Sequence, residues 1–340
     1  MIEKGLLKKM KTRRESGVIL LIIIIYITVA LIEPRFFSYN AFINVLLFFP
    51  YLLVVALGEM LEIVSRNVDI SLGSILGFSA VVVGMTYKAY PNLPIVIAFL
   101  IAIGVGTLLG FINGVLVNLL RLPSVIITLG TMNLFRGLMF IIVGAKQIDN
   151  SCIPRSVVCL SQMGKTSLGV PTTVLIALII TALVGILITK TKLGKEIYAA
   201  GSNPEAAALR GISLNKIRLI VFSLSGFLCG IGAMIYISRI GYINPTVAGV
   251  GLEFTAVAAV VIGGTSMGGG VGSTLGTLLG CLLLGIINIA ISITGISGFW
   301  QEAIYGLIVI IAIVLDRFYQ IGLAREVTKQ KQQLQEGLNE

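Results

Sequence analysis

Residues 94–119 have the sequence PIVIAFLIAIGVGTLLGFINGVLVNL, which contains no charged side chain and is long enough to cross a bilayer as one helix. The rest of the chain has the same character. Of its 340 residues, 56% are hydrophobic and only 12% are charged, and the mean hydropathy is +1.02. Soluble domains contain about twice that share of charged residues. The sequence therefore predicts an all-α polytopic membrane protein with no sizeable soluble domain.

Apolar runs of this kind recur along the chain, and about ten of them are expected to be transmembrane helices. They lie near residues 18–32, 42–64, 68–87, 94–119, 123–144, 170–189, 217–238, 253–264, 272–293 and 299–315. Two of the runs are weak. The 68–87 run opens with polar residues, and the 253–264 run is too short for a full crossing. Either one can be a broken or re-entrant helix.

The distribution of Lys and Arg predicts the orientation, because cytoplasmic loops carry an excess of both. Most of the 25 Lys and Arg residues fall on one side if both termini are cytoplasmic. This topology gives a basic N-terminus at residues 1–17, a transmembrane domain at residues 18–316 and a cytoplasmic tail at residues 317–340. Residues 145–169 then form an external loop and residues 190–216 a cytoplasmic one. In a membrane protein this distribution matters more than the total, so the net charge of +10 does not indicate a nucleic-acid partner.

The sequence contains no histidine, the residue that most zinc sites and His-assisted nucleophiles require. We therefore expect neither a metal site nor an enzyme. Cys229 and Cys281 lie in apolar runs and are expected to be packing residues. Cys152 and Cys159 share the external loop, where a disulfide and two free thiols are both open.

The segment Met163-Gly164-Lys165-Thr166 ends like a phosphate-binding loop, but position 159 is Cys where that loop needs Gly. No strand is expected before it either. The sequence thus gives no sign that this chain binds ATP itself.

Glycines form a repeated pattern. Gly104-Val105-Gly106 has a near copy in Gly270-Val271-Gly272, with further glycines at the same spacing after each. The two copies run in opposite directions in the expected topology, which suits an inverted repeat, although glycine-rich helices also produce such matches by chance. In either case small residues spaced by four predict close helix packing. The residues concerned are Gly106, Gly110 and Gly114 in the first row and Gly272, Gly276 and Gly280 in the second.

The cytoplasmic loop contains a short helix with its own start and stop signals. Asn203 is a good N-cap and Pro204 suits the first helical position. Glu205 complements the positive end of the helix dipole, and Gly211 can adopt the left-handed conformation that stops a helix. Such a helix can be a lever for a cytoplasmic partner or an ordinary connection, and the capping signals do not distinguish the two.

This loop resembles a known family. Glu205-Ala206-Ala207 followed by Gly211 is similar to the E-A-A-x-x-x-G loop of ATP-binding-cassette (ABC) importer permeases, although the I-x-L-P ending is missing. Across about residues 45–317 the chain also resembles the ribose-type monosaccharide permeases. The matching segments are Arg66-Asn67-Val68-Asp69-Ile70-Ser71-Leu72-Gly73-Ser74, Asn113-Gly114, Leu122-Pro123-Ser124, Thr128-Leu129-Gly130-Thr131 and Ile262-Gly263-Gly264-Thr265 with Gly268-Gly269. Arg66-Asn67 and Gly249-Val250-Gly251-Leu252-Glu253 are similar to the autoinducer-2 and rhamnose branch.

The resemblance implies an importer in the bacterial inner membrane. Two permease subunits, identical or different, would form the path, and an external solute-binding protein would deliver the solute. Two separate ATPase subunits would use ATP and Mg²⁺, whereas this chain would bind no cofactor. The residues implied in coupling to the ATPase are Asn203, Pro204, Glu205, Ala206, Ala207 and Gly211.

Polar side chains inside the apolar runs are candidates for the translocation path, because such groups are costly in a bilayer. They are Asn67, Asp69, Asn113, Asn133, Arg136 and Glu253, and Asn288, Glu59 and Glu62 share this character. Asp69 can equally be a helix N-cap. Arg136 can equally form a structural ion pair, with a carboxylate that the sequence does not identify.

The predicted function is a permease subunit of an ABC importer for a monosaccharide or a related small polar solute. An ion-gradient-driven secondary transporter is the alternative, because an inverted repeat and intramembrane charges would suit it equally. The discriminating observation is whether an ATPase partner is required. An intramembrane enzyme is disfavoured, since the chain has no His and no Cys in a reactive setting.

Overall fold

The computed structural model describes residues 2–144, 146–162 and 170–295, and also residues 300, 303, 304, 306, 307, 310 and 314. The expected tail at 317–340, most of the 299–315 run and the Met163-Gly164-Lys165-Thr166 segment lie outside the described residues. Within them the chain is helical and has no β-strand, apart from one isolated bridge between Ile148 and Ile243.

Seven helices in the described part of the chain are long and apolar enough to cross a membrane. They are α2 (Tyr39–Val64), α3 (Leu72–Ala89), α4 (Ile95–Leu120), α5 (Ser124–Val143), α7 (Thr172–Lys190), α10 (Leu214–Ile240) and α12 (Thr274–Ile293). Two shorter apolar segments are residues 16–32 of α1 (Ile2–Ile32) and α11 (Leu252–Ile262). Each corresponds to a predicted apolar run, which confirms the all-α polytopic fold.

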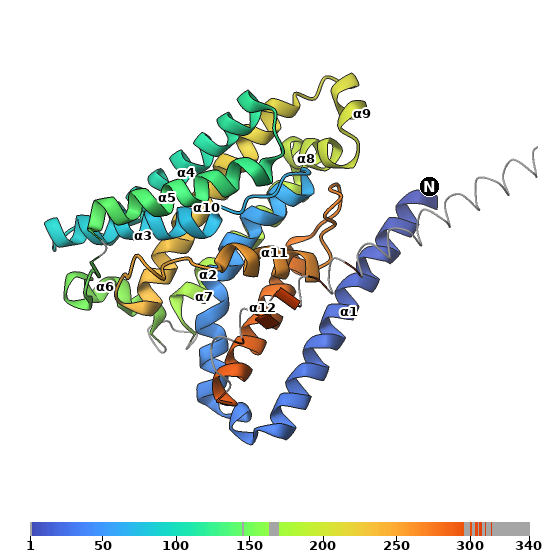
Figure 1. Cartoon of the computed structure of the whole chain (residues 1–340). Coiled ribbons are helices and arrows are strands. Elements are labelled where there is room, and N and C mark those ends of the chain that lie inside the picture. The colour runs from blue at the N-terminus through green and yellow to red at the C-terminus, as the bar shows by residue number, and fades with distance from the viewer. Residues whose placement is uncertain are drawn as a thin grey trace, which may run out of the picture.

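Short helical segments connect the long helices and gather at the two ends of the bundle. They are η1 (Pro34–Phe37), η2 (Asn150–Cys152), α6 (Arg155–Val158), η3 (Cys159–Ser161), α8 (Lys192–Ser202) and α9 (Pro204–Leu209). Figure 1 shows α8 and α9 at the opposite end from α6. The two loops that the sequence predicts on opposite sides of the membrane therefore lie far apart.

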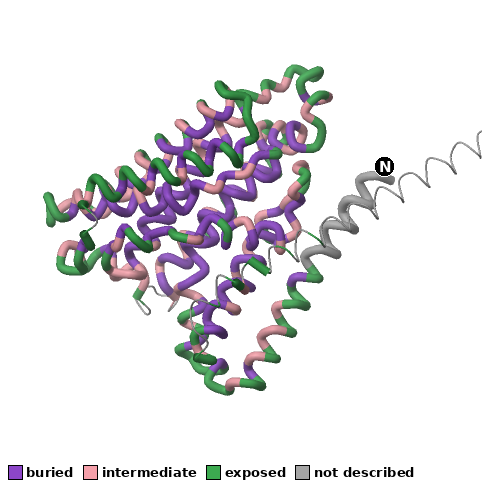
Figure 2. The backbone as a smooth tube through the Cα atoms, in the orientation of Figure 1, coloured by how far each residue is buried: buried purple, intermediate pink, exposed green. Residues whose placement is uncertain are grey.

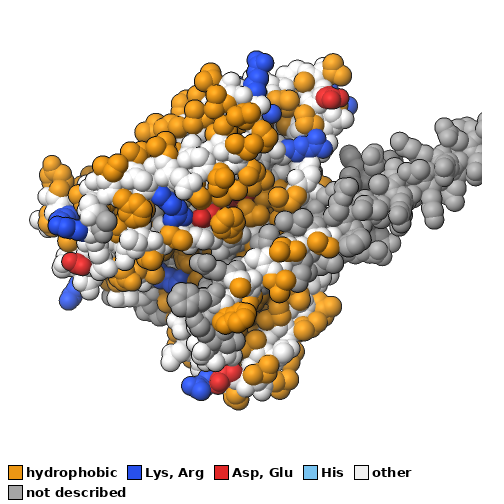
Figure 3. Space-filling model, in the orientation of Figure 1, with side chains coloured by type: hydrophobic (Ala, Val, Ile, Leu, Met, Phe, Trp, Pro, Cys, Tyr) orange, Lys and Arg blue, Asp and Glu red, His pale blue; other side chains and the backbone are white. Residues whose placement is uncertain are grey.

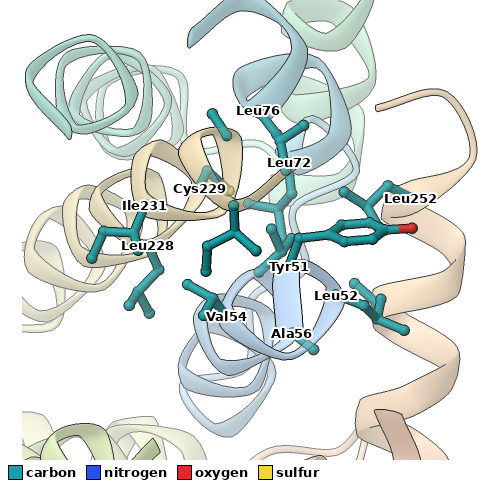
Figure 4. Packing of buried hydrophobic residues seen from close by; sticks show 14 of the residues in the cluster. Tyr51, Leu52, Val54, Ala56, Leu72, Leu76, Leu228, Cys229, Ile231 and Leu252 are labelled. Atoms are coloured by element: carbon teal, nitrogen blue, oxygen red, sulfur yellow. The ribbon is translucent and has the colours of Figure 1, made fainter. Parts of the chain in front are cut away.

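The core of the protein lies where α2, α3 and α10 meet (Figure 4). Over their most apolar stretches α2 and α10 are each 72% buried, whereas α4 and α5 are 28% and 22% buried. Figure 2 shows the same contrast, with buried residues along the centre and exposed ones on the outer helices. Apolar side chains cover much of the surface in Figure 3. A surface of this kind suits lipid or another membrane protein.

Glycine contacts join α4 to α10. Gly106 and Gly110 of α4 lie so close to α10 that a Cβ on either would meet its backbone. The opposing residues are Gly226 and Gly230, whose spacing of four repeats the small-residue pattern. Gly114 lies further along α4 against Leu219. The predicted glycine rows do not include these two α10 residues.

The second glycine row differs from the prediction. Gly276 and Gly280 of α12 pack against the backbone of α11 and its C-terminal cap. Gly272 instead lies in the connection before α12, because the Ser273 hydroxyl caps that helix by accepting from the Gly276 amide at 2.9 Å. The near copies at 104–106 and 270–272 thus lie in a helix interior and in a loop, and are not equivalent positions of a repeat.

All four cysteines are free thiols in the structure. Cys229 and Cys281 are buried among the helices, as their apolar surroundings predict. Cys152 and Cys159 are half-buried, in η2 and η3, and are not bonded to each other.

Candidate functional site

The short helix α9 has the ends that its sequence indicates. The Asn203 side chain accepts a hydrogen bond from the Ala206 amide at 3.0 Å, and Pro204 is the first helical residue. Gly211 follows the helix with a φ of 80°, in the left-handed region that favours glycine. Asn203 is also the C-cap of α8, so the chain turns sharply between the two helices.

The outer face of α9 is open to a partner. Ala207 is buried against the protein, while Glu205 and Ala208 are exposed. Leu209 is 91% exposed, the largest value among the exposed large hydrophobic residues of the described chain. An exposed apolar side chain such as Leu209, on the same short helix as the acidic Glu205, is suited to contact with another protein.

Behind α9, the end of α8 meets two other segments at backbone level. Gly201 is buried, and a Cβ there would run into the Val64 carbonyl at the end of α2. That same carbonyl accepts a hydrogen bond from the Gly270 amide at 2.8 Å. Only a residue without a side chain fits at position 201. The end of α8, the end of α2 and the 263–273 connection therefore form one unit.

Two side chains reinforce this unit. The Tyr198 hydroxyl of α8 donates to the Gly272 carbonyl at 2.7 Å, and burial raises the pKa of Tyr198 above its usual value near 10.0, which keeps the hydroxyl available as a donor. Arg66 Nε donates to the Gly268 carbonyl at 2.7 Å. Arg66 has a φ of 65°, which is uncommon for a residue with a side chain. We call the unit formed by Val64, Arg66, Tyr198, Gly201, Gly268, Gly270 and Gly272 the coupling junction.

The chain that follows the coupling junction is attached to α5 by two hydrogen bonds. The Val68 amide donates to Ser124 Oγ at 2.9 Å, and the Ile70 amide donates to Thr128 Oγ1 at 3.1 Å. These side chains satisfy backbone donors that would otherwise be unpaired in the protein interior. As a result, the weak run predicted at 68–87 is a broken segment in which α3 starts only at Leu72.

Asp69 and Asn113 form a buried polar cluster with Ser71. Asp69 Oδ1 accepts from the Ser71 amide at 2.6 Å, and Asp69 Oδ2 accepts from Asn113 Nδ2 at 3.1 Å. Asn113 Nδ2 also donates to Ser71 Oγ at 2.7 Å. All three residues are fully buried. Asp69 is therefore not the N-cap of α3, which is Ser71, although it satisfies the Ser71 amide just before that helix. Asp69 also belongs to a polar group between α3 and α4.

Arg136 and Glu253 form an ion pair that joins α5 to the start of α11. Arg136 Nη2 lies 3.1 Å from Glu253 Oε1, and the side chains are 16% and 4% exposed. The same nitrogen donates to the Gly249 carbonyl at 3.3 Å. This identifies the carboxylate partner of Arg136 that the sequence left open.

The two remaining candidates lie apart from these clusters. Asn67 is buried and donates to the backbone and hydroxyl oxygens of Ser65, at 3.1 and 3.0 Å. Asn133 is exposed and donates only within its own helix, to the Leu129 carbonyl at 3.0 Å. The structure thus brings four of the six candidates together in two pairs, one beside the α2–α3 connection and one at the start of α11.

Residues 41–313 match the protein family described as "Branched-chain amino acid transport system / permease component". The chain belongs to this permease family. The permease is 34% identical to the "Autoinducer 2 import system permease protein LsrC" of Yersinia enterocolitica, over 94% of this chain and 87% of the relative. It is 33% identical to the protein of the same name from Escherichia coli, over 96% and 93%. No solved structure matches it.

Family membership and the membrane-length helices give the function in outline. The protein is a multi-pass permease subunit of an ABC importer in the inner membrane. Of the two kinds of transporter that the sequence left open, the family supports the importer and not the ion-gradient-driven one. An importer of this family implies ATPase and solute-binding partners. A transport component of this kind is not itself an enzyme.

Proposed function

We propose that this permease imports autoinducer 2 or a closely related small, sugar-like polar solute. The names of the relatives support the substrate class, because the identity extends over nearly the whole of both chains. In this proposal two permease subunits form the path, an external binding protein delivers the solute, and two ATPase subunits bind ATP and Mg²⁺. This chain itself binds no cofactor.

The coupling junction carries the mechanical part of the proposal. We place α9 in the cytoplasm, as the positive-inside rule predicts, with Glu205 and Leu209 facing the ATPase. Movement of α9 displaces α8, and Gly201 transfers the displacement to Val64 because no side chain lies between the two backbones. After α2 the chain continues through Arg66 to Asp69, in the segment that is hydrogen-bonded to α5. ATPase closure would thus reach the polar cluster at the start of α3.

The two polar pairs are the proposed movable contacts along the path. The Asp69–Asn113 pair holds α3 to α4, and the Arg136–Glu253 pair holds α5 to α11. Both pairs can break and re-form as helices shift, because each is made by side chains of different elements. Asn67 and Asn133 add neutral amides. Such groups suit weak binding of a polar solute, which conduction requires because the solute must also leave.

The test is co-purification. The permease is expressed with its ATPase subunit and purified in detergent, with and without Glu205→Lys. We expect the wild type to retain the ATPase and the variant to lose it, because the substitution reverses the charge on the exposed face of α9. Glu33→Lys is the matched control, since it makes the same charge change at a residue between α1 and η1. Retention of the ATPase by the α9 variant at the wild-type level would contradict the proposal.

A further inference from the structure

Two acidic side chains of α2 have no part in the mechanism above. Glu59 and Glu62 are both completely inaccessible to solvent, and their spacing of three places them on one face of the helix. None of their four carboxyl oxygens has a hydrogen-bond partner among the described residues. Carboxyl groups buried in this way are rare, and inside a membrane protein they mark a functional site by default.

The surroundings of the pair are polar but supply no cation. The Asp69 backbone amide faces Glu59 and the Ser225 hydroxyl of α10 faces Glu62, but neither reaches hydrogen-bonding geometry. Ser225 is itself fully buried, and its oxygen would lie 2.7 Å from a Cβ at Gly58. Ser225 Oγ therefore points at the acidic face of α2 without a partner of its own.

The titratable groups that act on the pair are acidic ones. Asp69, from the α2–α3 connection, acts on both carboxyl groups, and Glu59 also acts on Glu62; the two carboxyl groups in turn act on Cys229 of α10. The other titratable and charged side chains on the described helices packed against α2 act on neither carboxyl; they are Arg35 on η1, Lys190 on α7, Lys192, Lys195, Glu196 and Tyr198 on α8, Lys216, Arg218, Tyr236 and Arg239 on α10, Glu253 on α11 and Cys281 on α12. Two ionised carboxylates here would repel each other without compensation, in a medium of low polarity.

Asp69 differs from the pair, because it accepts hydrogen bonds from the Ser71 amide and from Asn113. Donors of this kind favour an ionised carboxylate, and Glu59 and Glu62 lack them. A metal ion does not explain the pair, because the described residues contain no group of three or more His, Cys, Asp or Glu side chains arranged to hold one. The ligand that balances two isolated carboxyl groups is the proton.

We propose that Glu59 and Glu62, with Ser225, form a proton-binding site between α2 and α10, in which both carboxyl groups are protonated in this conformation. The protons leave when water reaches the site, which requires α2 and α10 to separate. Figure 4 shows the apolar packing of the same two helices that excludes water. This goes beyond solute import, which makes no demand on protons.

The site lies next to the coupling junction. The Glu62 carbonyl accepts from Ser65 Oγ and from the Asn67 amide, both at 2.9 Å, and Val64 is two residues further on. Movement of α8 against the end of α2 is therefore expected to change the contact that shields the carboxyl groups. Ionisation would in turn favour the separated state, so protonation and the conformation of the junction are linked.

Infrared spectroscopy of the purified full-length permease tests the proposal directly, because a protonated carboxyl group has a C=O band that an ionised one lacks. We expect the band at neutral pH in the wild type, its partial loss in Glu59→Gln and in Glu62→Gln, and its absence in the double variant. The band should remain in Asp69→Asn. The wild-type spectrum does not depend on whether any variant folds. The measurement also does not involve transport, so its result tests the proton-binding site separately from the proposed function.

The pH dependence of thermal unfolding is the second measurement. In the wild type, neutral buried carboxyl groups stabilise the folded state at low pH, and this contribution is lost as the pH rises, since the unfolded chain ionises at about pH 4–5. The wild type should therefore lose stability relative to the double Gln variant as the pH rises above about 5. A wild-type spectrum without the C=O band at neutral pH would overturn the proposal. Stabilisation by Na⁺ in place of the band would overturn it as well, and would assign the pair to a metal ion.

Discussion

The Val64 carbonyl accepts a hydrogen bond from the Gly270 amide at 2.8 Å, and this contact closes the coupling junction. It joins the end of α2 to the connection between α11 and α12, and Gly201 of α8 packs directly against it. Backbone contacts of this kind are stiff, because no side-chain rotamer can absorb a displacement. The three segments should therefore move together when α9 moves.

Arg66 tests whether the junction needs a strained backbone. Its φ of 65° is unfavourable for a residue with a Cβ but not for glycine. Arg66→Ala and Arg66→Gly both remove the hydrogen bond to the Gly268 carbonyl, so they differ mainly in this strain. We expect Arg66→Gly to be more stable than Arg66→Ala by about 1 kcal/mol in thermal or denaturant unfolding. Equal stability of the two variants would show that the left-handed conformation is not kept in the membrane.

Tyr198→Phe removes one hydroxyl from the junction and changes nothing else. The loss of its hydrogen bond to Gly272 should cost about 1 kcal/mol of stability and should lower uptake into vesicles. Burial raises the pKa of Tyr198, so the contribution of the neutral hydroxyl is present below about pH 10 and is lost as the pH rises through the higher folded-state value. Tyr242→Phe is the control, because Tyr242 is exposed away from the junction. Identical stability and uptake of the two Phe variants would show that the Tyr198 hydroxyl contributes to neither.

The Arg136–Glu253 pair is suited to a double-mutant cycle. The side chains are 16% and 4% exposed, so removal of one partner leaves a poorly solvated charge on the other. We expect Arg136→Gln and Glu253→Gln each to destabilise the protein by about 3 kcal/mol, and the double variant by much less than the sum. Additive losses would mean that the two groups do not interact in the membrane.

Asn203 tests the contribution of the cap to α9. Asn203→Ala removes the acceptor for the Ala206 amide and should cost about 1 kcal/mol, whereas Asn203→Ser keeps a capping oxygen and should cost little. If α9 is the lever, uptake should follow the same order. Uptake that is equal in the two variants would mean that transport does not depend on the ordered start of α9.

Local features of the structure were predictable where the deciding signal is local. The apolar runs gave the helices, and Asn203, Pro204 and Gly211 gave the ends of α9, because capping depends on adjacent residues. The polar start at Asp69 likewise indicated a broken segment before α3. Gly272 was predicted to lie on a helix face, but α12 begins only at Thr274, because Ser273 is its N-cap.

Contacts between distant segments were not predictable. The choice of Glu253 as the partner of Arg136 depends on how α5 and α11 pack, which no periodicity encodes. Tyr198 and Gly201 carried no signal either, because a tyrosine and a glycine in a polar loop are unremarkable until two other segments approach them. Ser124 and Thr128 stood in the motifs that carried the family resemblance, but their role as acceptors for Val68 and Ile70 required the structure.

Gly201→Ala tests whether Gly201 transmits the movement of α9 to α2. A Cβ there would collide with the Val64 carbonyl, whereas Gly137→Ala in α5 adds the same atom where nothing lies within 4 Å. The measurement is solute uptake and ATP hydrolysis by the complete reconstituted importer in the same vesicles. We expect Gly201→Ala to hydrolyse ATP with little uptake and Gly137→Ala to behave like the wild type. Uptake per ATP at the wild-type level in Gly201→Ala would show that Gly201 does not transmit the movement of α9.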